Sequence, residues 1–190
     1  MSKKYLSEKD FEGVDFSEKE IASREYEKCT FNNCKFSNSD LSNISFIECL
    51  FENCDFSMAK ISTTVFRDVE FKACKLLGLN FEHCNDLLLS MSFKSCQLNL
   101  SSFYRLNLKN TIFKDCNLQE VDFTEADLTG STVTNCDLGG AIFKNSKLKK
   151  VDFRKSYNFS IDPEINQIKE AKFSLTEVPG LLDKYNLEIE

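Results

Sequence analysis

Residues 29–58 read CTFNNCKFSNSDLSNISFIECLFENCDFSM, which divides into six consecutive groups of five residues. The third residue of each group is large and apolar, the first is small or apolar, and the last is most often Asn. A period of five fits neither an α-helix, with about 3.6 residues per turn, nor a β-strand, with a period of two. The stretch therefore predicts an internal repeat rather than an ordinary helix or strand.

The repeat extends in both directions from this stretch. A large residue recurs at every fifth position from Phe11 to Phe81. The pattern breaks at Asn85–Asp86–Leu87 and resumes two residues out of phase, with Leu88 as the next large residue and Phe153 as the last. We therefore expect a two-residue bulge near 85–87, after which the chain continues on the same face as before.

The best copies of the motif are CKFSN (34–38), CDFSM (54–58), VDFTE (121–125) and ADLTG (126–130). The motif resembles the pentapeptide-repeat family, and the match covers roughly residues 9–155. The resemblance implies an all-β solenoid, a right-handed quadrilateral parallel β-helix with four groups per coil and about seven coils. Residues 1–8 are then an N-terminal lead-in, and residues 156–190 form a C-terminal cap.

Cysteines mark the length of one coil. Successive members are twenty residues apart, with one step of twenty-two that spans the break: Cys34, Cys54, Cys74, Cys96, Cys116 and Cys136. All nine cysteines take the small position of the motif, where we expect them to point inward and pack as small fillers. Neighbours such as Cys29 and Cys34 are five residues apart, whereas zinc knuckles use spacings of two to four. No metal site and no cofactor is predicted.

Composition restricts the kind of protein further. The chain has 190 residues and a net charge of −6, which argues mildly against nonspecific nucleic-acid binding. The N-terminal MSKKYLSEKDFE lacks the apolar stretch of a signal peptide, and no segment is apolar over the length needed to span a bilayer. We expect a cytoplasmic protein with reduced thiols. His83 is the only histidine, without a nucleophile expected beside it, so no catalytic residue is predicted and the protein is not expected to be an enzyme.

The outward charges suggest binding surfaces. Asp15, Lys35, Asp55 and Lys75 are expected to stack with alternating sign, while Lys72, Lys94 and Lys114 are expected to stack on one face. Residues 115–143 contain acids and no Lys or Arg, and a basic stretch follows at 144–155. The acidic belt is either a solvated surface or a partner-binding surface. Its members are Asp115, Glu120, Asp122, Glu125, Asp127 and Asp137.

The tail TEVPGLLDKYNLEIE (176–190) predicts a short helix over about 177–185 and an alternating end. The end of a solenoid exposes unpaired backbone and apolar core, so it needs a cap. The tail is more apolar than a simple cap requires, which favours a cap that also forms a homodimer interface. The alternative is a monomer with a folded-over cap. The candidate interface residues are Leu181, Leu182, Tyr185, Leu187 and Ile189.

A second resemblance concerns function. Residues 161–168, IDPEINQI, lie outside the repeat and are similar to an INPEINRI-like segment of the microcin B17 immunity protein McbG. Within the family, this resemblance points to the topoisomerase-protection group that includes Qnr, MfpA and McbG. It implies a dimeric, DNA-mimicking, non-enzymatic protein that binds bacterial DNA gyrase or topoisomerase IV and protects it from quinolones or peptide toxins. The alternative is a structural or scaffold module that binds an unrelated protein.

Overall fold

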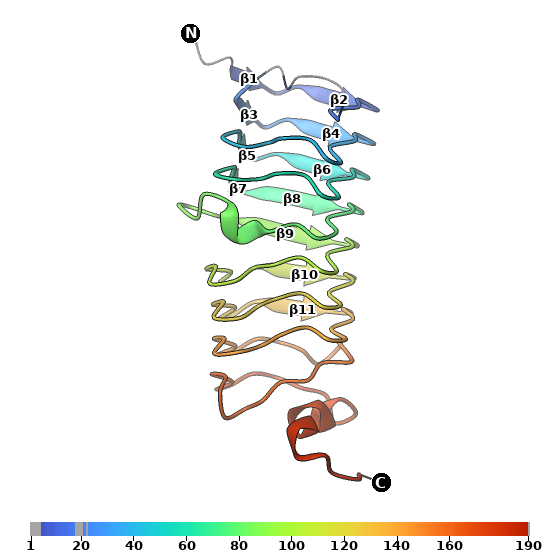
Figure 1. Ribbon diagram of the computed structural model, residues 1–190, viewed down its shortest axis with the longest axis vertical. Helices are drawn as coiled ribbons and strands as arrows, with labels where there is room; N and C mark the ends of the chain where they lie inside the picture. The colour runs from blue at the N-terminus through green and yellow to red at the C-terminus, as the bar shows by residue number, and fades with distance from the viewer. Residues whose placement is uncertain (1–4, 18–20, 22, 190) are drawn as a thin grey trace.

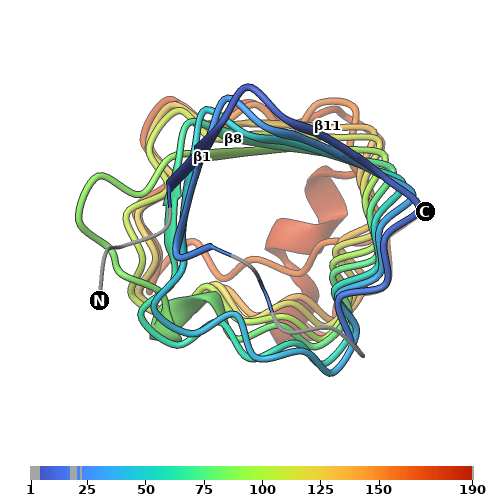
Figure 2. The same cartoon turned by 90° about the horizontal axis from the view of Figure 1, so that it is seen from above.

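The chain winds into a long rod with a coil of nearly constant size (Figure 1). The computed structural model describes residues 5–17, 21 and 23–189. Viewed along the rod, the coils superpose into a four-sided outline, and the chain turns clockwise as it recedes from the N-terminal end (Figure 2). The fold is the predicted right-handed quadrilateral parallel β-helix.

Two sides of the rod are regular parallel sheets, and their register confirms the twenty-residue coil. Tyr5 pairs with Glu25, and Phe31 pairs with Phe51. One side holds four strands in the order β1 (Tyr5–Ser7), β3 (Glu25–Glu27), β5 (Ser45–Ile47) and β7 (Val65–Arg67). The other holds seven: β2 (Asp10–Glu12), β4 (Thr30–Asn32), β6 (Leu50–Glu52), β8 (Val69–Lys72), β9 (Met91–Lys94), β10 (Ile112–Lys114) and β11 (Thr132–Thr134).

The first rung begins earlier than predicted. Strand β1 starts at Tyr5, inside the segment 1–8 that was expected to be a lead-in, and pairs in parallel with β3. Leu6 is partly buried against the core because it lies five residues before Phe11, in phase with the repeat. Residues 1–4 of the predicted lead-in lie outside the described part of the chain.

Stacked aromatic rings form the core. Phe31 lies on Phe51 with ring centroids 4.7 Å apart, Phe51 lies on Phe71 at 5.3 Å, and each pair is nearly parallel. Rings on adjoining sides of a coil meet edge to face, as Phe31 and Phe36 do at 5.6 Å. Both arrangements are favourable for aromatic rings. The lumen is therefore filled by side chains, and the predicted columns of large residues are its core.

The cysteines line the lumen as free, buried thiols. Cys54 Sγ donates weakly to the carbonyl oxygens of Phe31 and Glu52, both at 3.3 Å, and Cys74 Sγ repeats this with Phe51 at 3.4 Å. Burial raises the pKa of Cys49 to about 11, which keeps this thiol protonated and unreactive. Among the described residues, no group of three or more His, Cys, Asp or Glu side chains is arranged to hold a metal ion.

The break in the repeat is an outward bulge, but the inward residue differs from the prediction. A 3-10 helix, η1 (Phe81–His83), precedes the bulge. Before the bulge, Asn85 still pairs with Val65, twenty residues earlier. After it, Met91 pairs with Val69, twenty-two residues earlier, so the two extra residues lie between Asn85 and Met91. Leu88 was expected in the core, yet 64% of it is exposed. The Leu89 N–H donates to the Asp86 carbonyl at 3.3 Å, and this turn requires Leu88 at φ 60°, so that Leu89 packs inward instead.

The rungs continue past residue 155 before the tail begins. Bridges join Lys147 to Gln167 and Asp152 to Lys172, and Phe173 stacks on Phe153 at 5.4 Å, so the rung expected at 171–173 is present. The tail then forms two 3-10 helices, η2 (Val178–Leu181) and η3 (Asp183–Tyr185), instead of one helix and an alternating strand.

The physical reason for this correction lies in two residues of the tail. Gly180, inside the predicted helix, disfavours a regular helix because of its conformational freedom, and Asn186 in the left-handed conformation ends the second short helix. In the described residues, no helix has the length and apolar character to cross a bilayer.

Candidate interaction surfaces

The tail is fixed to the end of the rod by one close backbone approach. The Ile161 N–H donates to the Gly180 carbonyl at 3.0 Å. A Cβ on Gly180 would lie 2.1 Å from the Phe159 carbonyl oxygen and 3.1 Å from its ring. Only glycine fits at this contact, because the obstructing atom belongs to the backbone and has no room to move. Gly180 therefore sets the position of the tail on the last rung.

A second contact, which we name the lysine clamp, fastens η3 to the segment that follows the repeats. Lys184 Nζ lies 2.8 Å from Asp162 Oδ1 and 2.6 Å from Glu164 Oε2. The Tyr185 hydroxyl donates to Glu164 Oε1 at 2.9 Å, and Lys184 lies over the Tyr185 ring at 4.9 Å. Hydrogen bonds from Lys184 hold the pKa values of Asp162 and Glu164 below their usual range. Desolvation opposes the ammonium charge, but hydrogen bonds to the two carboxylates outweigh it and raise the pKa of Lys184.

The segment 161–168 that carries Asp162 and Glu164 is itself rigidly held. Asn166 is buried and its amide donates to the carbonyl oxygens of Phe143 and Asp162, both at 2.9 Å. Its Oδ1 accepts from the Ser146 N–H at 2.8 Å. The segment therefore connects the last coils to the tail through side chains that the repeat pattern does not specify.

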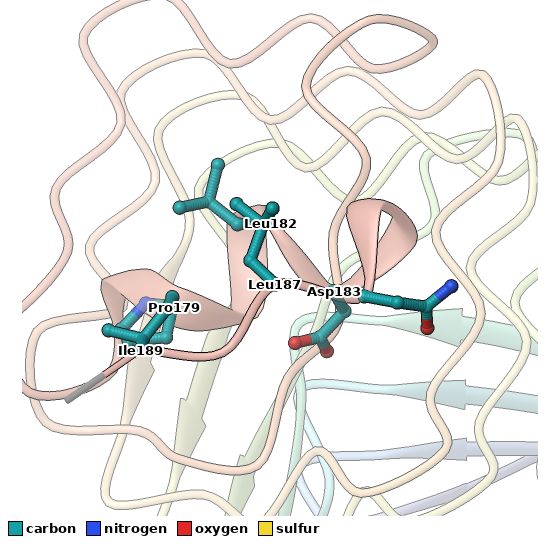
Figure 3. A pocket seen from close by; sticks show the side chains of 6 residues that line it. Pro179, Leu182, Asp183, Leu187 and Ile189 are labelled. Atoms are coloured by element: carbon teal, nitrogen blue, oxygen red, sulfur yellow. The ribbon is translucent and has the colours of Figure 1, made fainter.

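The predicted dimer residues divide into two groups. Leu182, Leu187 and Ile189 are 37%, 57% and 54% exposed, and they line a shallow hollow at the end of the rod together with Pro179, Asp183 and Asn186 (Figure 3). We call its four apolar residues, Pro179, Leu182, Leu187 and Ile189, the end surface. Leu181 instead packs partly against the core.

Two other exposed residues near the C-terminal end do not belong to the end surface. Tyr185, although 49% exposed, has its hydroxyl bound to Glu164. Leu175, which was not predicted as an interface residue, is the most exposed large apolar residue in the described part of the chain, at 90%.

The acidic belt extends over several sides of the rod and does not form one patch. Asp122, Asp127 and Asp137 belong to three different columns of bridged residues, which continue to Ile142, Lys147 and Tyr157. The structure therefore does not bring the six predicted acids together on one side.

Two members of the belt are neutralised by basic residues on other rungs. Glu125 pairs with Arg105 at 2.7 Å, and the hydrogen bond from Arg105 lowers the pKa of Glu125. Asp127 lies 3.5 Å from Lys109 and 3.4 Å from Lys147. In the part of the chain described, no ion pair involves the other four acids: Asp115, Glu120, Asp122 and Asp137.

The two predicted charge columns are both present. Asp15, Lys35, Asp55 and Lys75 are joined by successive bridges, so that charges alternate, and Lys35 lies 3.3 Å from Asp15. The second column, which we name the lysine column, places Lys72 beside Lys94 and Lys94 beside Lys114 in the sheet register. Neighbouring strands thus present like charges side by side.

Comparison with known proteins identifies the class to which this rod belongs. A family model described as a pentapeptide repeat region matches residues 24–86 and 81–157. The chain belongs to the pentapeptide-repeat family. No curated protein matches its sequence.

Among solved structures, HetL shares the fold at low sequence identity. HetL, a pentapeptide repeat protein involved in heterocyst differentiation regulation from the cyanobacterium Nostoc sp. strain PCC 7120, is 16% identical and has a TM-score of 0.61, covering 90% of this chain and 84% of HetL. A trypsin-treated form of QnrB1, a plasmid-mediated fluoroquinolone resistance protein, is 20% identical with a TM-score of 0.46, covering 98% of this chain and 100% of that one.

Proposed function

We propose that this chain is a non-enzymatic binding protein that imitates DNA, interacts with a bacterial type II topoisomerase and protects it from quinolones or peptide toxins. The observation that carries the proposal is the segment 161–168. It resembles a segment of the microcin B17 immunity protein McbG and lies beyond the residues that the family model matches. Within it, Ile161 and Asn166 are buried and Ile168 packs partly against the core, so the remaining residues are not required by the core. The lysine clamp is formed by Glu164, which matches the McbG segment, and by Asp162, which stands where that segment has Asn; residues 161–168 thus help to position the tail.

The end surface would be covered by a second copy of the chain. Leu182, Leu187 and Ile189 are apolar and lie together on a tail that the Gly180 contact and the lysine clamp hold in one place. A preorganised apolar surface loses little conformational freedom on association, which favours binding. Two rods joined at this end would form a dimer roughly 70 Å long, given strands about 4.8 Å apart.

The charge of such a dimer limits how the imitation of DNA could work. Duplex DNA of about 70 Å carries roughly 40 negative charges, at one per ~1.7 Å. Two copies of a chain with net charge −6 carry far fewer. Shape and the four unpaired acids of the belt, rather than total charge, would therefore direct the topoisomerase contact. We place the protein in the cytoplasm, where such an enzyme acts.

A supercoiling assay with purified gyrase tests the proposal. We expect the wild-type chain to preserve supercoiling in the presence of a quinolone or of microcin B17. Replacing the four unpaired acids by their amides should weaken protection by about tenfold or more. The matched control is Glu125→Gln with Asp127→Asn, which removes acids that are already ion-paired and should have a smaller effect. Absence of both gyrase binding and protection would refute the proposal.

A scaffold module that binds an unrelated protein is the second candidate. The pairing of Glu125 and Asp127 with basic residues favours it, because a surface selected to imitate DNA should keep its acids unpaired. The fold does not decide between the candidates, since one fold can serve many functions. Affinity capture from a bacterial extract separates them: recovery of gyrase or topoisomerase IV supports the first candidate, and recovery of another protein without them supports the second.

A further inference from the structure

The lysine column is unfavourable within one molecule. Like charges directly opposite one another on neighbouring strands destabilise a sheet, whereas opposite charges stabilise it. In the column that runs from Asp15 to Lys75, the same fold alternates its charges. Lys72 is compensated by Glu70 at 3.3 Å, but among the described residues no ion pair involves Lys94 or Lys114. A partner with negative charge would remove this repulsion.

The same side of the rod carries the complementary charges at its other end. We name the outward side of β2 to β11, with the bridged rungs of Asp152 and Lys172, the bipolar face. Its N-terminal half, strands β2 to β8, has four outward acids and one lysine, a net charge of −3: Asp10, Glu12, Glu52, Glu70 and Lys72. Its C-terminal half has four outward basic residues and one acid, a net charge of +3: Lys94, Lys114, Asp152, Arg154 and Lys172.

We propose that the bipolar face binds the same face of a second copy of this chain, with the two rods antiparallel. A two-fold axis between β8 and β9 places Glu52 of one copy opposite Lys114 of the other, and Glu12 opposite Arg154. It also places Leu50 opposite Ile112, an apolar residue that is 49% exposed and is not part of the core. The proposal is independent of the topoisomerase hypothesis and of the end surface.

The same axis brings two unfavourable pairs together. Asp10 lies near Asp152 of the partner, although the charge of Asp152 is already compensated by Arg154 at 2.7 Å. Lys72 lies near Lys94 of the partner, but its charge is already compensated by Glu70. A two-fold arrangement is self-complementary, because each contact occurs twice. Favourable and unfavourable pairs are thus equal in number, and the attraction comes from the opposite net charges of the two halves. Glu52 and Lys114 contribute most to it, because among the described residues neither forms an ion pair within its own chain.

The size of the face predicts a weak, salt-sensitive contact. Each side of a coil spans three residues, or about 10 Å, and the rungs of the face extend over about 40 Å at ~4.8 Å each. The footprint of about 400 Å² per copy is half that of a standard interface. Charge pairs supply most of the attraction, and they are screened at high ionic strength. We therefore expect association at about 50 mM salt that is lost at about 500 mM.

Charge exchange tests the proposal by sedimentation velocity of the full chain. A Leu187→Asp substitution is present in every sample, so that the end surface does not contribute. Lys94→Glu with Lys114→Glu gives both halves of the face a net negative charge, although Arg154 and Lys172 remain, and Glu12→Lys with Glu52→Lys gives its N-terminal half a net positive charge. Each variant alone should associate at least about tenfold more weakly, and their equimolar mixture should recover association. If the unmutated face shows no association at low salt, or the mixture does not recover it, the proposal is wrong.

A matched control uses the alternating column. Lys35→Glu with Lys75→Glu changes the net charge by the same amount but should leave association unchanged. Stability provides a second readout: Lys94→Glu converts the lysine column into an alternating one and should raise the unfolding temperature by about 1–4 °C, while Lys35→Glu should lower it. Unchanged association in the Lys94→Glu, Lys114→Glu variant would show that the lysine column is only solvated surface.

Discussion

The repeat body and the C-terminal end of this rod are stabilised in opposite ways. In the body, each rung repeats the contacts of its neighbours, so that Phe51 lies between Phe31 and Phe71 as many other rings do between theirs. At the end, single contacts hold the chain, such as the Gly180 approach to Phe159 and the clamp around Lys184. The body repeats the same kind of contact in many rungs, whereas the end depends on contacts that each occur once.

Because of this difference, we expect the body to determine the stability of the fold and the end to determine association. In a solenoid each rung contacts mainly its neighbours, so a substitution in one rung weakens that rung and its interfaces with the two adjacent rungs. The tail contacts only the last rungs, and its loss should leave the body folded. Substitutions in the body should therefore change the free energy of unfolding, and substitutions at the end should change association.

The largest effect is expected in the body. Phe51→Ala removes a fully buried ring together with its stacking contacts to Phe31 and Phe71. It should lower the free energy of unfolding, measured by urea titration, by about 3–5 kcal/mol. A loss below about 1 kcal/mol would mean that the stacked rings are not the source of stability.

The cysteines test how tightly the body is packed. Cys54→Leu adds volume to a filled lumen and should cost about 1–3 kcal/mol, while Cys54→Ala should cost about 1 kcal/mol. Urea titration of both variants measures the difference. Unfolding of the wild-type chain by a chelator would contradict the packing role, because a metal would then be needed for stability.

Gly180→Ala should break the end without breaking the body. The new Cβ has no room beside the Phe159 carbonyl, so the tail must leave its position and association through the end surface should weaken by about tenfold or more. Analytical ultracentrifugation measures this. Gly139→Ala is the matched control, because a Cβ there meets its nearest atom at 3.4 Å, and it should associate as the wild type does.

The smallest effect is expected at the lysine clamp and depends on pH. Asp162 and Glu164 have lowered pKa values in the folded chain, so their contribution is present above the ordinary carboxyl pKa of about 4 and is lost as pH falls through the lowered values. Lys184 has a raised pKa, so its contribution persists below about pH 10.

Proteolysis of the tail measures the contribution of the clamp. At pH 7, Lys184→Met should be cleaved there a few times faster than the wild type, and the difference should vanish in strong acid. Lys184→Arg keeps the charge and serves as the control. Equal cleavage of Lys184→Met and wild type at pH 7 would show that the clamp does not hold the tail.

Much of the body could be predicted because its signal is repeated. The position of Cys34 in the motif predicts its burial, since the same position recurs twenty residues later in Cys54 and in every following coil. The phase change located the bulge but did not show which leucine points inward, Leu88 or Leu89. The turn closed by the hydrogen bond from Leu89 to Asp86 places Leu89 inward. In the tail, the apolar residues were found but not their roles, and Leu181 packs inward.

The sequence by itself determined the coil of twenty residues, the inward and outward positions and the columns of charge, because a period of five leaves the chain only one way to bury its large residues. Only the tertiary structure decided which acids are neutralised, as Arg105 reaches Glu125 from another rung. It also decided how the tail is held, since Gly180 and Lys184 act through residues about twenty positions away. Each of these contacts occurs once along the chain, so no repeated pattern of residues predicts it.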